Sequence, residues 1–296
     1  IIRTAAKNNA MNFGNTLNFN KAFQKKSRNF SLVLNNANSN NYSDGLIQSK
    51  TIFYQDGRPN DERNQKNTGQ NTSDSYSAEF EYTEPVTDSL RIRFGADFDW
   101  EKEMKETKTL DFDTNTQSYT IINPSLSNYV HSVQNTISPK IGLTFEKSKF
   151  TFNLNSNVSF IAFNNHSSYM NNELDLNNKY SLPYGRAQIR YKFRRSKFIT
   201  IAYDFINTLP SYTQLLPVEN LANPLNTVIG NPNLNPNKQH SVTINFRNFD
   251  FRTRSGYSLF LKGEYYNSEI VSISTYDANR KKSTTYENIS GTYTTS

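Results

Sequence analysis

The sequence predicts an all-β fold, an antiparallel transmembrane β-barrel of which about eleven strands are visible. Three observations predict it: most segments alternate apolar and polar residues, the apolar residues are largely aromatic, and long polar loops alternate with short turns. A barrel with lipid outside and water inside has this arrangement, because one face of each strand is apolar and the other is polar.

Composition narrows the alternatives. Only 35% of the 296 residues are hydrophobic, and 18 Tyr and 21 Phe supply much of that share. An ordinary soluble core of this size needs more aliphatic residues. Composition alone remains compatible with a soluble β-solenoid or sandwich.

The residue types that carry chemistry are scattered. The chain has no cysteine, and His131, His166 and His240 lie far apart without metal-ligand spacing. Residues 111–115 copy the first three ligand positions of a calcium loop without its glycine and glutamate, and a hairpin tip explains them equally well. The carboxylates of residues 97–101 share a face, as on any polar strand face. We predict no catalytic residue, no metal site, no cofactor and no enzymatic activity.

The net charge of +7 is no sign of nucleic-acid binding. The basic residues fall mostly at short turns and are interrupted by strands, whereas a nucleic-acid groove needs a continuous basic surface. We therefore expect no nucleic acid among the partners.

The first predicted strand begins near Asn12, and the basic turn at residues 24–28 leads into a second strand that extends through residues 46–54. Residues 55–75 have almost no apolar side chain and predict a long solvent loop. Residues 164–183 and 208–239 are predicted as two further long loops. The predicted short turns are residues 24–28, 84–88, 147–148, 194–197 and 250–254.

The hairpin over residues 78–101 has one apolar and one charged face. If Tyr82 lies opposite Leu90, opposite charges face each other across the two strands. We predict that these side chains face the lumen and that each pair contributes at most about 1 kcal/mol, because water reaches it. The predicted ladder pairs Glu79 with Arg93 and Glu81 with Arg91.

Later strands alternate in the same way, and this predicts which side chains face lipid and which face the lumen. The predicted lipid-facing set is Phe150, Phe152, Leu154, Phe160, Ile189, Tyr191, Ile201, Tyr203, Val242 and Ile244. The predicted lumen-facing set is Asn153, Asn155, Arg190, Lys192, Thr243 and Asn245.

Residues 210–238 differ from the rest of the chain, since they hold five of the ten prolines and no alternating run. Prolines remove backbone donors and reduce the entropy cost of holding a loop shape, which favours a structured binding loop. Covering the barrel mouth is the alternative role. The candidate ligand contacts in this loop are Tyr212, Gln214, Asn220, Asn226 and Asn231.

The order PSYTQL, NPL and GNPNLNP within residues 210–236, followed by an alternating strand, resembles the outer-membrane barrel portion of TonB-dependent receptors. A GNPxLxP element typically precedes a transmembrane strand in that family. Residues 79–95, the Ser127–Asn128 step and the C-terminal YENISGTYTTS are similar to it as well. The resemblance covers nearly the whole chain, and its most specific element is the motif over residues 210–236.

The resemblance implies a barrel of about 22 strands, an N-terminal plug domain, and import of a scarce nutrient energised by TonB. An odd number of visible strands and a start at Ile1 without a signal peptide predict a fragment. Residues 1–296 are then a partial outer-membrane β-barrel domain, with the plug and the segment that contacts TonB outside this chain.

The implied location is the outer membrane of a Gram-negative cell. The implied partners are outer-membrane lipid, TonB and a small nutrient, for which siderophore, cobalamin, glycan and peptide all stay open. Two alternatives also stay open: a non-transporting surface binding or secretion-complex barrel, such as an adhesin, and a soluble β-rich carbohydrate-active enzyme.

Overall fold

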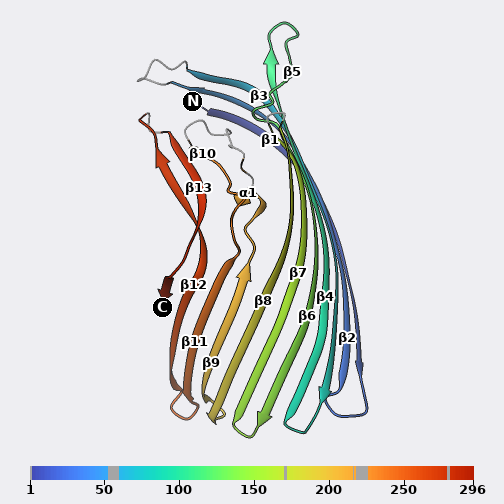
Figure 1. Ribbon diagram of the computed structural model, residues 1–296, viewed down its shortest axis with the longest axis vertical. Helices are drawn as coiled ribbons and strands as arrows, with labels where there is room; N and C mark the ends of the chain where they lie inside the picture. The colour runs from blue at the N-terminus through green and yellow to red at the C-terminus, as the bar shows by residue number, and fades with distance from the viewer. Residues whose placement is uncertain (1, 53–59, 170–171, 216, 218–225, 279–280) are drawn as a thin grey trace.

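The chain forms one sheet of antiparallel strands that follow each other in sequence and curve into a wall (Figure 1). The computed structural model describes residues 2–52, 60–169, 172–215, 217, 226–278 and 281–296. Within these ranges the sheet is not closed, and β1 forms one of its edges. The predicted all-β fold with antiparallel strands is therefore confirmed, as a curved wall that is open within the described residues.

The strands of the wall are long and joined alternately by tight turns and longer connections. They are β1 (Ile2–Ala22), β2 (Asn29–Thr51), β3 (Asp61–Pro85), β4 (Leu90–Asp113), β6 (Asn128–Lys147), β7 (Phe150–Tyr169), β8 (Asn172–Arg194), β9 (Lys197–Thr208), β11 (Asn237–Asp250) and β12 (Ser255–Tyr276).

The other elements are shorter. They are β5 (Ser118–Ile122), helix α1 (Tyr212–Leu215), β10 (Asn226–Val228), β13 (Lys282–Ile289) and β14 (Thr292–Thr295). All but β14, which pairs with the middle of β12, lie toward the rim opposite the tight turns. The described residues thus contain fourteen strands where the sequence predicted about eleven.

No helix in the described ranges has the length and apolar content needed to cross a bilayer.

The two faces of the wall differ in polarity and in burial. Large apolar side chains are exposed on one face and small polar side chains are buried on the other, which is the reverse of a soluble protein. On one face Phe160 is 53% and Val242 45% exposed, while on the other Ser138 is 4% and Ser241 6% exposed. Cross-strand register places the predicted lipid-facing side chains together on the first face and the predicted lumen-facing ones together on the second. Because the apolar face lacks any protein cover in the described residues, the predicted assignment of faces is confirmed.

The apolar face covers only part of each strand. In β4 it runs from Ile92 to Trp100 and ends at Lys102, although the strand continues to Asp113. A tilted strand needs about 9–11 residues to cross the hydrocarbon. The remainder of β4 therefore extends beyond the membrane on the long-loop side.

Two of the predicted loops are strands in this extension. Of the loop predicted over 55–75, residues 61–75 all belong to β3 and residues 55–59 lie outside the described ranges. The stretch over 164–183 is the β7–β8 hairpin, whose residues 170–171 also lie outside them. The first prediction was wrong because a strand with water on both faces needs no apolar alternation. The second was wrong because the alternating run with Leu174, Leu176, Tyr180 and Leu182 was read as part of an asparagine-rich loop. The third predicted loop, between β9 and β11, is confirmed in its described part, which contains α1 and β10, while residues 216 and 218–225 lie outside the described ranges.

We predict that Ile244→Lys destabilises the barrel by about 2–4 kcal/mol, since it places a charge in the middle of the lipid-facing band. Ile244 lies opposite Ile201 in the register. The matched control is Asn245→Lys, one residue along the strand on the polar face. The measurement is urea unfolding of the protein refolded into lipid vesicles, and equal losses for the two variants contradict the assignment of faces.

Candidate functional site

The polar face carries a charge network that is centred on Lys140 of β6. Its ammonium Nζ donates to Glu79 Oε1 (2.6 Å) and to Asp97 Oδ1 (2.7 Å), and its side chain is 21% exposed. Glu79 and Asp97 lie directly opposite each other on β3 and β4. Lys140 thus neutralises two carboxylates that otherwise repel across the strand pair.

Gly95 makes the position of this lysine possible. A Cβ added at Gly95 lies 2.7 Å from Lys140 Cε and 2.5 Å from the Phe80 carbonyl oxygen. Any larger residue therefore displaces the lysine stem from the sheet surface. Gly142 has the same role for Arg93, whose guanidinium lies 3.0 Å from a Cβ at that position.

The predicted pairing of Glu81 with Arg91 and Glu79 with Arg93 was wrong. Tyr82 lies opposite Phe94 and not Leu90, because the turn centres two residues later than expected. Pro85 still belongs to β3, and Thr87 Oγ1 accepts hydrogen bonds from the backbone N–H of Ser89 (3.2 Å) and Leu90 (3.0 Å).

The four ladder residues share the predicted face but have other neighbours. Arg91 Nη2 lies 3.4 Å from Glu146 Oε2, and Arg93 donates to Asn155 Oδ1. Glu81 lies opposite Gly95 and lines a hollow of about 200 Å³ with Lys140 and Tyr184. Sequence reasoning missed Lys140 because its partners are some 40–60 residues away along the chain.

The connection from β9 to β11 folds back over the polar face. Ser211 and Gln214 close the turn that begins α1: the Ser211 carbonyl accepts the Gln214 N–H (3.0 Å), and Gln214 Oε1 accepts the Ser211 N–H (2.8 Å), which is the glutamine half of a capping box. This turn presents Leu215, which is only 3% exposed, and the buried Pro210 to the wall. The segment thereby lies on the lumen side.

A cavity of about 220 Å³ lies between this segment and the wall. Glu101, Glu103, Ser132 and Gln134 supply polar groups to it, and strands β7 and β8 supply aromatic rings. The cavity on the lumen face thus combines hydrogen-bond acceptors, hydrogen-bond donors and aromatic rings. Further lining residues are Ser73, Lys102, Phe163, Tyr180, Leu209 and Ser211.

The GNPNLNP segment is fastened to β13. Asn231 donates from its backbone N–H to the Gln214 carbonyl (2.6 Å) and from Nδ2 to the Tyr286 carbonyl (3.0 Å), while its Oδ1 accepts the Asn233 N–H (3.0 Å). Asn288 makes two bonds with the backbone of Asn235, at 2.8 and 3.0 Å. β10 adds a parallel pairing with β13. Asparagine side chains therefore supply bonds that the prolines cannot donate.

The five predicted ligand contacts have different surroundings. Asn231 and the Oε1 atom of Gln214 hold the loop in shape, whereas Asn226 is exposed. Tyr212 belongs to α1, and Asn220 lies outside the described residues. Ligand contact by this set remains a prediction.

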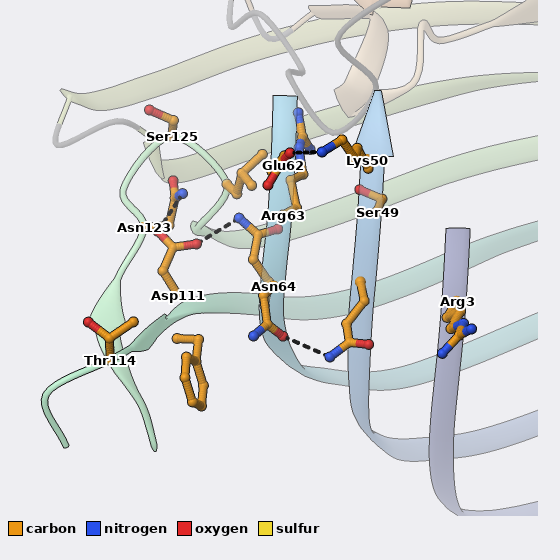
Figure 2. A pocket seen from close by; sticks show the side chains of 14 residues that line it. Arg3, Ser49, Lys50, Glu62, Arg63, Asn64, Asp111, Thr114, Asn123 and Ser125 are labelled. Carbon is orange, nitrogen blue, oxygen red and sulfur yellow. Dashed lines mark hydrogen bonds and ion pairs between the residues drawn. The ribbon is translucent and has the colours of Figure 1, made fainter. Parts of the chain in front are cut away.

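A second, larger hollow of about 960 Å³ lies at the long-loop rim, between the ends of β2, β3 and β4 (Figure 2). Asp111 accepts hydrogen bonds there from Gln65 Nε2 (2.7 Å) and Asn123 Nδ2 (2.9 Å). Beside them, Lys50 pairs with Glu62. The sequence analysis missed this hollow because it assigned residues 55–75 to a loop.

The nearby hairpin tip is held by its own acidic side chain. The backbone N–H of Asn115 donates to Asp113 (2.8 Å), and this bond lowers the pKa of the Asp113 carboxyl, with a further contribution from the Thr116 hydroxyl. A turn-capping role thus accounts for the residues that resemble the start of a calcium loop.

Comparison with known proteins supplies the family. Residues 21–296 match the outer membrane protein beta-barrel family. The chain belongs to this family. This outer-membrane barrel therefore lies in the outer membrane of a Gram-negative cell, where short turns face the periplasm and long loops face outward.

The fold of the barrel wall is similar to parts of solved structures. It is similar to BauA, the ferric preacinetobactin receptor from Acinetobacter baumannii, with a TM-score of 0.51 and 12% identity over 94% of this chain and 40% of BauA. For Fiu, the ferric-catecholate import receptor of E. coli K12, the TM-score is 0.45 at 9% identity, over 90% of this chain and 45% of Fiu. The barrel wall described here thus spans less than half of either receptor. No curated protein matches the sequence.

We predict that Lys140→Met destabilises the outer-membrane barrel by about 1–2 kcal/mol, since it leaves Glu79 and Asp97 face to face without their cation. Adding Glu79→Gln to this variant is expected to restore part of the loss. Urea unfolding in vesicles measures both, with Lys105→Met as the control lysine on β4. A loss that Glu79→Gln does not relieve argues against repulsion as the cause.

We also predict that Asn231→Ala loosens the loop, because it removes the bonds to the Tyr286 carbonyl and the Asn233 N–H, at about 1 kcal/mol each. Amide hydrogen exchange is expected to rise in residues 226–237 and in β13 but not in β3 or β4. The control is Asn226→Ala, which alters an exposed amide in the same loop. Unchanged exchange in β13 contradicts the fastening role.

Proposed function

We propose that this barrel is the wall of a TonB-dependent receptor that binds a scarce small nutrient near its long-loop rim and imports it. The observation that most supports this is the inward fold of the β9–β11 connection, which lies against the lumen face through Leu215. A loop in that position meets any solute that passes along the lumen. The fold similarity to BauA is consistent with this role.

The chemistry of the two hollows suits a polar ligand. The rim hollow combines amides, two carboxylates and arginines, and the cavity under α1 adds aromatic side chains. Aromatic rings give a rigid contact surface and amides give adaptable hydrogen bonds. We expect an iron-loaded siderophore first, the ligand class of BauA. Cobalamin, glycans and peptides are further candidates of similar polarity.

The rest of the receptor follows from the same proposal. Residues 1–296 form part of a barrel of about 22 strands, and a plug domain and the segment that contacts TonB belong to other parts of the receptor. Within the loop, Asn226 is the candidate contact with an exposed amide. Import and not catalysis is the proposed activity.

The test uses the full-length protein and a panel of iron-loaded siderophores. Asn226→Ala is expected to weaken binding about fivefold to tenfold, the effect of one lost hydrogen bond, as measured by isothermal titration calorimetry. The matched control is Asn164→Ala, an exposed amide on the outer face of the β7 extension. If wild type and Asn226→Ala bind the siderophore with equal affinity, the loop is not part of the binding site.

Energy coupling is tested separately in cells. Uptake of the bound ligand is expected to stop when the tonB gene is deleted, while binding at the cell surface persists. Uptake that continues without TonB contradicts the coupling. Binding without uptake in either strain favours the alternative, a surface barrel that does not transport.

A further inference from the structure

Three neighbouring turns on the short-turn rim carry a large surplus of positive charge. Residues 146–149, 194–197 and 250–254 contain seven cations and two carboxylates. These turns connect β6 to β7, β8 to β9 and β11 to β12, which follow one another in the sheet. The cations are Lys147, Lys149, Arg194, Arg195, Lys197, Arg252 and Arg254.

Hydrogen bonds between the turns hold them along one edge. The Lys192 N–H donates to the Lys149 carbonyl (2.8 Å), which joins the first turn to the second. The Phe249 N–H donates to the Ser196 carbonyl (3.1 Å), and Ser196 Oγ donates back to the Phe249 carbonyl (2.6 Å). The cations are thus displayed on a fixed backbone.

The two carboxylates in these turns have other partners. Glu146 pairs with Arg91, and Asp250 accepts the Arg252 backbone N–H at 2.8 Å. Among the described residues, none of the seven cations forms an ion pair with a carboxylate. Their charge is therefore available to an external anion.

Exposed aromatic rings accompany these cations. Phe193 is 41% and Phe251 71% exposed. The Lys197 ammonium lies 5.4 Å from the centroid of the Phe193 ring and 5.9 Å from that of Phe246, on the lipid-facing side. Aromatic side chains at the end of an apolar band mark the interface between hydrocarbon and headgroups. The basic turns continue directly from this interface.

We propose that this basic rim, the seven cations of the three turns, binds anionic phospholipids of the periplasmic leaflet. The cations hold the headgroup phosphates, and Phe193 contacts the upper acyl chains on the lipid-facing side. A phospholipid fits this surface because it presents a negative headgroup next to an apolar chain, in the order in which the rim presents cations and rings. The inference does not depend on nutrient import.

The test titrates short-chain fluorescent phosphatidylglycerol and phosphatidylcholine into the full-length protein in non-ionic detergent and follows fluorescence anisotropy. Wild type is expected to prefer phosphatidylglycerol at least about tenfold at low salt, given the attraction of several cations to one anionic lipid. In R194Q/R195Q/K197Q the preference is expected to disappear. The matched control K7Q/K105Q/K179Q removes the same charge from strand positions outside these turns and is expected to keep it.

Several outcomes overturn the proposal. The first is that wild type does not prefer phosphatidylglycerol. The second is that R194Q/R195Q/K197Q keeps the preference. The third is that the control K7Q/K105Q/K179Q loses the preference to the same extent. If about 0.5 M NaCl does not reduce the preference for phosphatidylglycerol, its electrostatic origin is contradicted. R194K/R195K retains the charge and is expected to retain the preference. If the triple variant does not fold, R252Q/R254Q in the neighbouring turn applies the same test.

Discussion

The structure depends on one constraint: inside hydrocarbon, each backbone N–H and C=O needs a partner within the protein. The wall meets it by pairing consecutive strands over most of their length, for example twenty-three residue pairs between β2 and β3. Pairing fixes register, and register decides which side chains share a face. With the backbone satisfied, side chains need only match lipid on one face and water on the other.

The same constraint explains why small polar residues are buried. Ser132, Thr136 and Ser138 lie on the lumen face of β6, and each is at most 8% exposed. Larger side chains from neighbouring strands lie across such positions, as Lys140 lies across Gly95 and Arg93 beside Gly142. Small residues thus make room for long charged ones, which reach partners two strands away and reinforce the register that the backbone already sets.

Much of the wall was predictable because lipid imposes a pattern on the sequence. Where a strand lies between lipid and lumen, as over residues 150–160, alternation is nearly complete, and both the strand and its orientation were identified correctly. Residues 61–75 have water on both sides and show no alternation, so their strand structure left no signal. Residues 173–182 do alternate, with Leu174, Leu176, Tyr180 and Leu182 on one face, and this signal was missed because the asparagines around it were read as a loop. The charge ladder failed for another reason: a turn centred two residues later changes each predicted pair, and the Thr87 side chain that stabilises this turn is a weak signal.

The long loop shows how a segment without alternation still acquires a defined shape. Its prolines limit the backbone, and Asn231, together with Asn288 of β13, provides directed hydrogen bonds to carbonyl and N–H groups that have no strand partner. Those asparagines are therefore committed to structure, which leaves exposed amides such as Asn226 for recognition. From composition alone the two classes of asparagine are indistinguishable, because the difference lies in partners that are about 55 residues away. Because some asparagines hold the loop rigid, the remaining ones lose less conformational entropy when a ligand binds. Fastening the loop and binding a ligand are thus compatible roles for one segment.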